Sequence, residues 1–248
     1  KKNKSNNLKY IKYIKYYKFK IIISSIIILF SFLIYLSIPV FYNYDTYDKV
    51  LKNKINQDFK INVMNIKKIE YKFLPKPHFI IQDSIINLIE GNNISKIDKF
   101  KVYVDLKNLH KIGEIQLKKI VINNANLKFK YLDLISFHQH LQKKITKPIY
   151  IYNSNFFYYT KDEKNILISP IKKFAYFIDK KNRKKYLKTS GILFGTNFKF
   201  SWMKDYNEPN FSKSYIRFKN LNLHINNLFE NDYENNSFKS KMDIEFLR

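Results

Sequence analysis

The sequence predicts a mainly β protein that starts with a membrane-spanning helix. Three observations support this: an uncharged apolar run near the N-terminus, apolar and polar residues alternating over most of the chain beyond residue 60, and only two further segments with helical spacing. Alternation at every second residue is typical of half-buried strands with one apolar face. We expect a transmembrane helix and a short amphipathic helix, followed by a curved, twisted, mostly antiparallel sheet.

The composition fits a folded chain with a strongly basic surface. The chain has 248 residues, 45% of them hydrophobic, and a formal net charge of +26. Such a charge attracts nucleic acids and anionic membranes alike. Because the basic residues are almost all Lys, and Asn, Ile, Tyr and Phe are also abundant, we interpret most of the charge as compositional drift and the rest as attraction to anionic lipid. We expect no nucleic-acid partner, since no recognition motif is present.

The uncharged run extends from Ile21 to Tyr42. A helix of that length spans about 33 Å, enough to cross a hydrocarbon core of roughly 30 Å. A cleaved signal peptide has a shorter apolar region that ends in small residues, whereas this run ends in the bulky sequence PVFYNY. We therefore predict an uncleaved anchor at residues 21–42.

The charges that flank the run predict its orientation. Residues 1–20 contain eight Lys and no acid, and an excess of cations marks the cytoplasmic side. We expect a basic cytoplasmic segment at 1–20 and a domain across the membrane at 43–248. The basic segment can form a short interfacial helix or belong to one continuous helix from about Leu8.

Two segments beyond the anchor have helical spacing. The first, at about 46–57, places Val50, Leu51, Ile55 and Phe59 on one side, and the second covers residues 131–144. Elsewhere the alternation slips by one residue at Lys118–Lys119 and at Lys219–Asn220. Such slips predict β-bulges, which bend a sheet. The apolar face of this sheet can be covered by closure into a sandwich or barrel, or it can remain a trough for a lipid tail.

Residues that carry chemistry do not cluster in the sequence. The closely spaced His138 and His140 would point to different sides of a helix, and the acids occur singly or in an apparent turn. The four glycines form no phosphate-binding loop, and no nucleophile elbow is present. Without cysteine the chain has no disulfide and no thiol nucleophile. We expect no enzyme activity, no metal and no cofactor.

The order of the parts resembles the AsmA family, whose members begin with an inner-membrane anchor, a short helix and a hairpin of strand, Pro-x-Pro and strand. The hairpin residues are Pro75 and Pro77, followed by the acid Asp83. Residues 99–129 are similar to the family's next unit, with Gly113 in the turn. Two usual family glycines are replaced, one near Lys60 and one at Asn65, and Asn tolerates a left-handed turn. The matching apolar and aromatic positions of the hairpin are Ile66, Ile69, Tyr71, Phe73, Phe79 and Ile81.

The resemblance implies a single-pass protein of the bacterial inner membrane with a periplasmic β-domain. Its expected role is outer-membrane assembly and phospholipid transport through an open apolar groove, with an envelope protein as a possible partner. The alternative is a membrane-anchored scaffold of the cell envelope with a closed core and no lipid. We also expect the chain to be either part of a longer protein or a short relative. The candidate groove residues are Ile69, Tyr71, Phe73, Phe100, Val102, Val104, Leu127, Phe129, Ile192, Phe194, Phe198 and Phe200.

Overall fold

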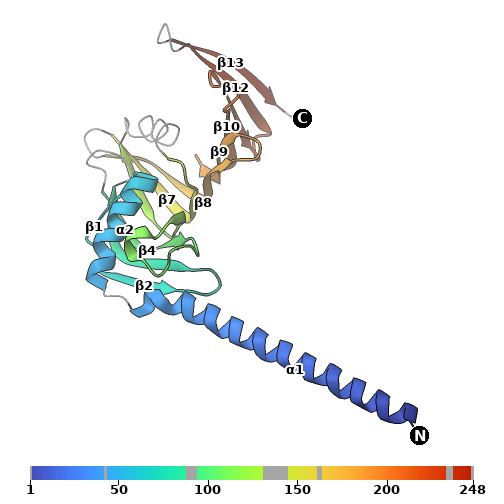
Figure 1. Ribbon diagram of the computed structural model, residues 1–248. Coiled ribbons are helices and arrows are strands. Elements are labelled where there is room, and N and C mark those ends of the chain that lie inside the picture. Colours follow the sequence, from blue (N-terminus) through green and yellow to red (C-terminus); the bar gives the residue numbers. More distant parts are fainter. Residues whose placement is uncertain are drawn as a thin grey trace.

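The protein is mainly β, as the alternation predicts, with one long N-terminal helix and a large open sheet. The computed structural model describes residues 2–41, 44–87, 94–130, 145–160, 164–232 and 237–246. Figure 1 shows the long helix projecting from a β-rich body, while the sheet continues away from that body into a separate lobe. The segment at 131–144, for which we predict a helix, lies outside the described residues.

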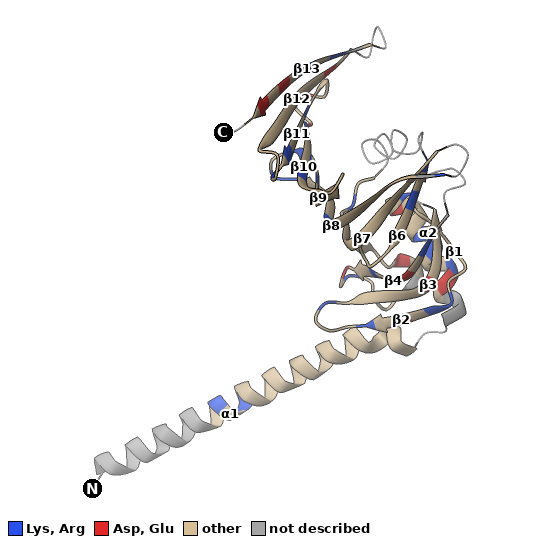
Figure 2. Cartoon of the chain, turned by 180° about the vertical axis from the view of Figure 1, so that it is seen from behind, with Lys and Arg blue, Asp and Glu red and all other residues tan. Residues whose placement is uncertain are grey.

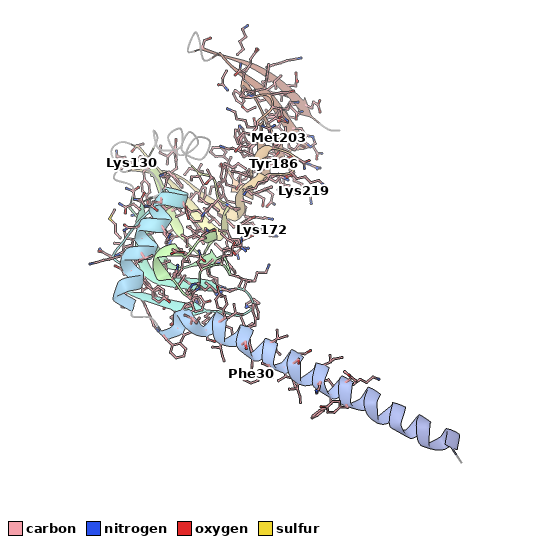
Figure 3. All side chains as sticks on the ribbon, in the orientation of Figure 1. Phe30, Lys130, Lys172, Tyr186, Met203 and Lys219 are labelled. Atoms are coloured by element: carbon pink, nitrogen blue, oxygen red, sulfur yellow. The ribbon has the colours of Figure 1, made fainter. Side chains whose placement is uncertain are left out.

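The N-terminal helix α1 is continuous from Lys2 to Ser37 and is followed by the 3-10 turn η1 (Ile38–Phe41). This matches the continuous-helix alternative rather than a separate interfacial helix. The α-helix ends two residues before Pro39, because the residue preceding a proline disfavours the α conformation. The helical segment Tyr16–Phe41 contains an 18-residue window with a mean hydropathy of 2.7, and among the described residues it is the one helix long and apolar enough to cross a membrane. Side chains such as Phe30 project into the surroundings (Figure 3).

Hydrogen bonds from tyrosine hydroxyls connect the end of α1 to the β-rich body. The Tyr35 hydroxyl donates to the Leu106 carbonyl over 2.7 Å, and the Tyr71 hydroxyl donates to the Leu36 carbonyl over 3.1 Å. Leu36 itself is buried in the core. These contacts place the body directly at the end of the apolar helix.

The second helix, α2 (Tyr44–Phe59), covers the sheet near β1, β2 and β5. Its buried side chains include Leu51, Ile55 and Phe59, which lie one turn apart on one face. The prediction of a helix at 46–57 is therefore confirmed, and the observed helix extends two residues further at each end. Lys60 follows with φ of 54°, the left-handed conformation that commonly ends a helix.

Over the described residues the sheet has thirteen strands in the order β1-β3-β4-β5-β7-β8-β9-β10-β11-β12-β13, with β2 beside β3 and β6 beside β7. All pairs are antiparallel except β5 with β7 and β6 with β7. A short 3-10 turn, η2 (Ile112–Glu114), precedes β5. The strands are β1 (Asn62–Met64), β2 (Lys68–Lys72), β3 (His78–Asn87), β4 (Ile94–Val104), β5 (Leu117–Asn123), β6 (Asn126–Lys130), β7 (Ile149–Tyr159), β8 (Asn165–Asp179), β9 (Lys184–Leu193), β10 (Thr196–Asp205), β11 (Phe211–Phe218), β12 (Leu223–Asp232) and β13 (Ser237–Phe246).

The Pro-Lys-Pro segment forms the connection between β2 and β3. These strands pair in antiparallel register up to Lys72 and His78, so Pro75 and Pro77 fall in the turn, where no ladder donor is needed. Asp83 follows within β3 with φ of 47°, and its carboxylate lies 3.5 Å from the Lys67 ammonium. Asn65 has φ of 46°, as the tolerance of Asn for the left-handed conformation predicts.

Of the two predicted bulges, one is confirmed and the other is a turn. Tyr103 pairs with Lys119 and Val104 with Leu117, which leaves Lys118 as the extra residue of a bulge. By contrast, residues 219–222 connect β11 to β12 as a hairpin turn. A short polar turn and a bulge shift the alternation in the same way, so the sequence pattern does not separate them.

Most of the core lies in the region enclosed by β1 to β8 and α2. On β8 the residues Ile171, Phe174 and Tyr176 are buried, and the Tyr176 hydroxyl donates to the Ile145 carbonyl over 2.9 Å. The buried cluster continues onto β9 and β10 with Leu187, Phe198 and Trp202. Beyond β8 the sheet continues as strands β9 to β13, here called the distal sheet (Figure 1).

Candidate functional site

The distal sheet carries one continuous apolar face, which the strand register defines. Residues directly opposite each other in an antiparallel pair point to the same side of the sheet. One such row runs from Phe200 on β10 through Ile216 and Ile225 to Ile244 on β13. We call this side the distal apolar face; its residues are Leu187, Phe198, Phe200, Trp202, Ile216, Phe218, Leu223, Ile225, Met242, Ile244 and Phe246.

This face is a continuation of the closed core. Leu187 on β9 pairs with the core residue Tyr176, and Gly191 pairs with Ile171. A side chain is excluded at Gly191, because a Cβ there would lie 2.2 Å from the Pro170 carbonyl oxygen. The sheet therefore passes without interruption from a covered region into an open one.

Burial falls steadily across the distal apolar face. Phe198 and Trp202 on β10 are buried, and Ile225 on β12 is half-buried. On β13 the side chains of Met242, Ile244 and Phe246 are 55%, 56% and 72% exposed. Figure 1 shows neither described helix lying over this part of the sheet. The described structure thus leaves a row of apolar side chains open at the edge strand.

The apolar face has a polar end. Along β9 and β10 it finishes at Lys185 and Lys204, which sit opposite each other, and Ser212 follows on β11. Burial and the neighbouring Lys204 lower the pKa of the Lys185 ammonium. An amphipathic molecule with a long tail would therefore meet apolar side chains over most of the face and cations at one end.

The opposite side of the distal sheet is basic. A hollow with a volume of about 870 Å³ is lined by five cations and by no acid. Among the described residues none of these five forms an ion pair. Glu245 on β13 is in register with Arg217 of the hollow, but it lies two strands away from it. Figure 2 shows the lysines and arginines of the inner distal strands and the acids of β13. The five cations are Lys172, Lys173, Lys199, Arg217 and Lys219.

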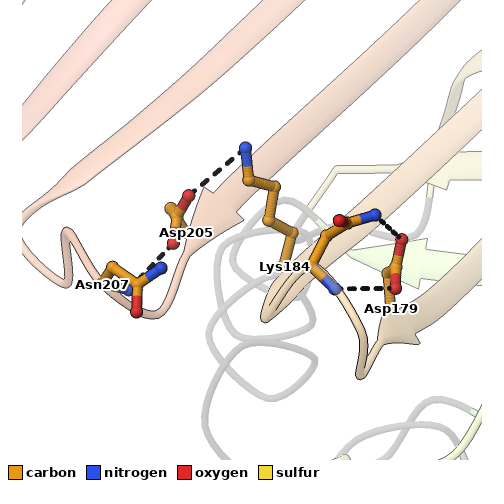
Figure 4. A network of polar contacts seen from close by, with 5 residues as sticks. Asp179, Lys184, Asp205 and Asn207 are labelled. Carbon is orange, nitrogen blue, oxygen red and sulfur yellow. Dashed lines mark hydrogen bonds and ion pairs between the residues drawn. The ribbon is translucent and has the colours of Figure 1, made fainter.

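The acids at the β8–β9 and β10–β11 turns have structural roles (Figure 4). Asp179 accepts backbone hydrogen bonds from Lys181 and Asn182 at 3.0 and 3.1 Å, and Asp205 accepts one from Asn207 at 2.8 Å. These hydrogen bonds to backbone amides hold the pKa of both carboxyl groups below the usual range. Together with the 3.3 Å ion pair from Lys184 to Asp205, they fix the β8–β9 and β10–β11 turns.

The sequence candidates divide into five groups. Tyr71 and Phe73 are partly buried against the core. Phe198 and Phe200 lie on the distal apolar face. Ile192 is on the opposite side of the sheet, beside Asn197. Phe194 is in the β9–β10 turn. The candidates buried in the closed core are Ile69, Phe100, Val102, Val104, Leu127 and Phe129.

Several residues of the open face were not among the sequence candidates. Ile225, Met242 and Ile244 alternate with polar residues in the same way as Phe198 and Phe200. Alternation alone does not distinguish a covered face from an open one, so their exposure had no signal in the sequence.

Among the described residues no group of three His, Cys, Asp or Glu side chains is placed to hold a metal ion. Comparison of the chain with protein-family models, with curated proteins and with solved structures gives no match. A functional interpretation therefore depends on the helix and the two faces of the distal sheet.

Proposed function

We propose that this protein is a membrane-anchored carrier of phospholipid that holds acyl chains along the distal apolar face. The observation behind the proposal is the continuous apolar row that begins at Phe200 on β10 and is open at Ile244 on β13. In a protein attached to a bilayer, the most abundant molecule able to cover such a row is a lipid tail. This role corresponds to the phospholipid transport and outer-membrane assembly that the AsmA resemblance implies.

The energetics of this face suit sliding rather than tight binding. Burial of apolar surface contributes about 25 cal/mol per Å², so each half-exposed Ile or Met side chain adds about 1 kcal/mol when a tail covers it. Neighbouring rows are separated by two residues, about 6.7 Å along a strand. Because the contributions are similar and closely spaced, a tail moves from one row to the next without losing all its contacts.

The topology follows from the anchor. The cations of residues 1–20 favour a cytoplasmic N-terminus, which places the β-domain on the other side of the membrane. For a bacterial inner membrane that side is the periplasm. The hydrogen bonds from Tyr35 and Tyr71 keep the body next to the membrane surface.

The scaffold alternative is favoured by one observation, the position of β13. This strand is at the end of the sheet order. A free edge can pair with a strand of another envelope protein. In that case the added strands would extend the sheet and the apolar face would contact protein instead of lipid.

Native mass spectrometry of the full chain released in detergent separates the two functions. We expect adducts with phospholipid masses, and we expect their loss when Ile225 and Ile244 are replaced by Asp. The matched control replaces Asn226 and Asp243, which pair on the other side of the same strands, by Lys. A chain that carries no lipid before any substitution would refute the carrier function.

A further inference from the structure

One end of the distal sheet gathers exposed apolar side chains next to the basic hollow. The β9–β10 turn and the β11–β12 turn lie at this end, since Phe198 pairs with Phe218 and the Lys219 amide donates to the Asn197 carbonyl over 3.0 Å. The last residue of β13, Phe246, pairs with Leu223 at the same end. We call this region the distal end; it comprises residues 194–195, residues 219–222 and Phe246.

The β9–β10 turn has an unusual residue at its tip. Leu193 pairs with Thr196, so only Phe194 and Gly195 form the turn, with φ of 50° and 74°. Two positive φ angles are typical of a type I′ turn, which prefers Asn, Asp or Gly at both positions. Phe194 is 78% exposed, so neither turn geometry nor core packing explains an aromatic side chain there. A strained conformation without a folding benefit indicates a functional constraint.

The neighbouring β11–β12 turn also has an exposed apolar side chain at its tip. Leu221 is 55% exposed at the tip of the β11–β12 turn. With Phe246 at the end of β13, the distal end therefore presents three large apolar side chains to the surroundings. Exposed apolar tips that are flanked by cations suit insertion between lipid head groups.

The flanking cations belong to the basic hollow. Its lining includes Ile192, two residues before Phe194, together with Lys172, Lys199, Arg217 and Lys219. Ammonium and guanidinium groups are donors for phosphate oxygens. Without an acid in the lining, a phosphate-rich surface complements this hollow.

The direction of the distal end agrees with a bilayer surface. Figure 1 shows the described end of β13 pointing to the side of the body toward which α1 extends. Lys219 also lies on this side of the distal sheet in the same view, and Lys172 on β8 lies below it, nearer the body (Figure 3). We propose that the distal end is a second membrane contact, which docks on anionic phospholipid of the bilayer that α1 crosses. Phe194 and Leu221 enter the head-group layer, while the hollow binds lipid phosphates.

This inference requires α1 to be a membrane anchor, but it does not require lipid on the distal apolar face. The basic hollow and the turn residue Phe194 are not part of the distal apolar face, and Phe246, which belongs to both surfaces, is unchanged in the test, so each proposal can fail alone. Each cation near an anionic surface strengthens attachment roughly fivefold, and three together contribute about a hundredfold.

The test places a tryptophan at the tip of the turn in the full chain. F194W is reconstituted in nanodiscs that contain brominated lipid, with either neutral lipid or lipid enriched in phosphatidylglycerol. We expect bromine to quench the new Trp in anionic nanodiscs, and we expect high salt to reverse the quenching. Trp202 is the single native Trp and lies on the distal apolar face, so the parent chain measured in the same nanodiscs gives the background quenching to subtract.

Charge variants test the basic hollow. Replacing Lys172, Lys199 and Lys219 together by Gln in the F194W chain should reduce attachment about a hundredfold and abolish the quenching. The control set consists of exposed lysines outside the hollow and should leave the quenching unchanged. Equal loss in both sets, or quenching that persists without the hollow cations, would overturn the proposal. The control lysines are Lys96, Lys180 and Lys181.

A final variant separates docking from folding. Asn fits a positive φ better than Phe, so F194N should raise or maintain the melting temperature. Amide exchange of residues 190–200, followed in anionic nanodiscs, should nevertheless become faster than in the parent chain. If tripolyphosphate protects these amides in neutral nanodiscs while anionic nanodiscs do not, the hollow binds a soluble anion and the membrane contact is refuted.

Discussion

Removing the apolar side chains from the edge strand should weaken phospholipid binding without unfolding the protein. The substitutions are Met242, Ile244 and Phe246 to Thr, which puts a β-branched residue that favours strands at each of these positions of β13. The side chains are 55%, 56% and 72% exposed, so little of the core depends on them. We expect each change to alter the free energy of unfolding by less than about 0.5 kcal/mol.

The size of the binding loss follows from these exposed fractions. Complete burial of a large apolar side chain contributes about 1.5–3 kcal/mol relative to full exposure. Because 55–72% of each side chain remains to be covered, a lipid tail gains about 1 kcal/mol from each. The three changes together should cost about 3 kcal/mol, or roughly a hundredfold in Kd.

The assay is equilibrium binding of a fluorescent phospholipid analogue to the full chain in amphipol. A matched control changes Lys241, Asp243 and Glu245 to Thr, which alters the same strand on its other side. We expect the control to bind within about twofold of the parent chain. Equal affinity of the apolar-face variant and the parent would refute the reasoning, as would equal losses in the two variants.

Three further predictions concern stability. Gly191→Ala should destabilise the fold by about 1–3 kcal/mol in denaturant titrations, because its Cβ would lie 2.2 Å from the Pro170 carbonyl oxygen; Gly195→Ala should cost only about 1 kcal/mol, through its positive φ. Lys60→Gly should raise the free energy of unfolding by about 1 kcal/mol, since Lys60 has φ of 54°, and an unchanged or lower value would contradict this. Burial lowers the pKa of His78, so below about pH 6.5 the unfolded chain binds more protons than the folded chain, and the free energy of unfolding should fall as the pH decreases. His78→Gln should flatten that fall, and an unchanged pH profile of the variant would contradict this prediction.

Alternation predicted the fold class because it directly reports the two faces of a strand. It also located the bulge at Lys118, where two polar residues interrupt the pattern. It did not divide the segment 192–202 into two strands. Phe194 continues the apolar spacing through the turn, so Gly195 was the only local sign that the chain reverses there.

The position of the open face could not be predicted for a different reason. Phe100 and Phe198 occur in the same alternating pattern, yet the first is in the closed core and the second begins the distal apolar face. The difference depends on how far the sheet curls around α2, which is a property of the whole sheet. The basic hollow likewise depends on register, because it joins Lys173 on β8 to Arg217 on β11.

Site-specific photocrosslinking on β13 in native membranes tests the central claim most directly. A photoreactive residue at Ile244 lies on the distal apolar face, whereas the same residue at Glu245 lies on the other side of the sheet. Lipid carriage predicts phospholipid crosslinks at Ile244 that clearly exceed those at Glu245, because docking of the distal end alone would bring the bilayer equally near both positions. Crosslinks to protein alone at Ile244, or equal lipid labelling at both positions, would contradict the account.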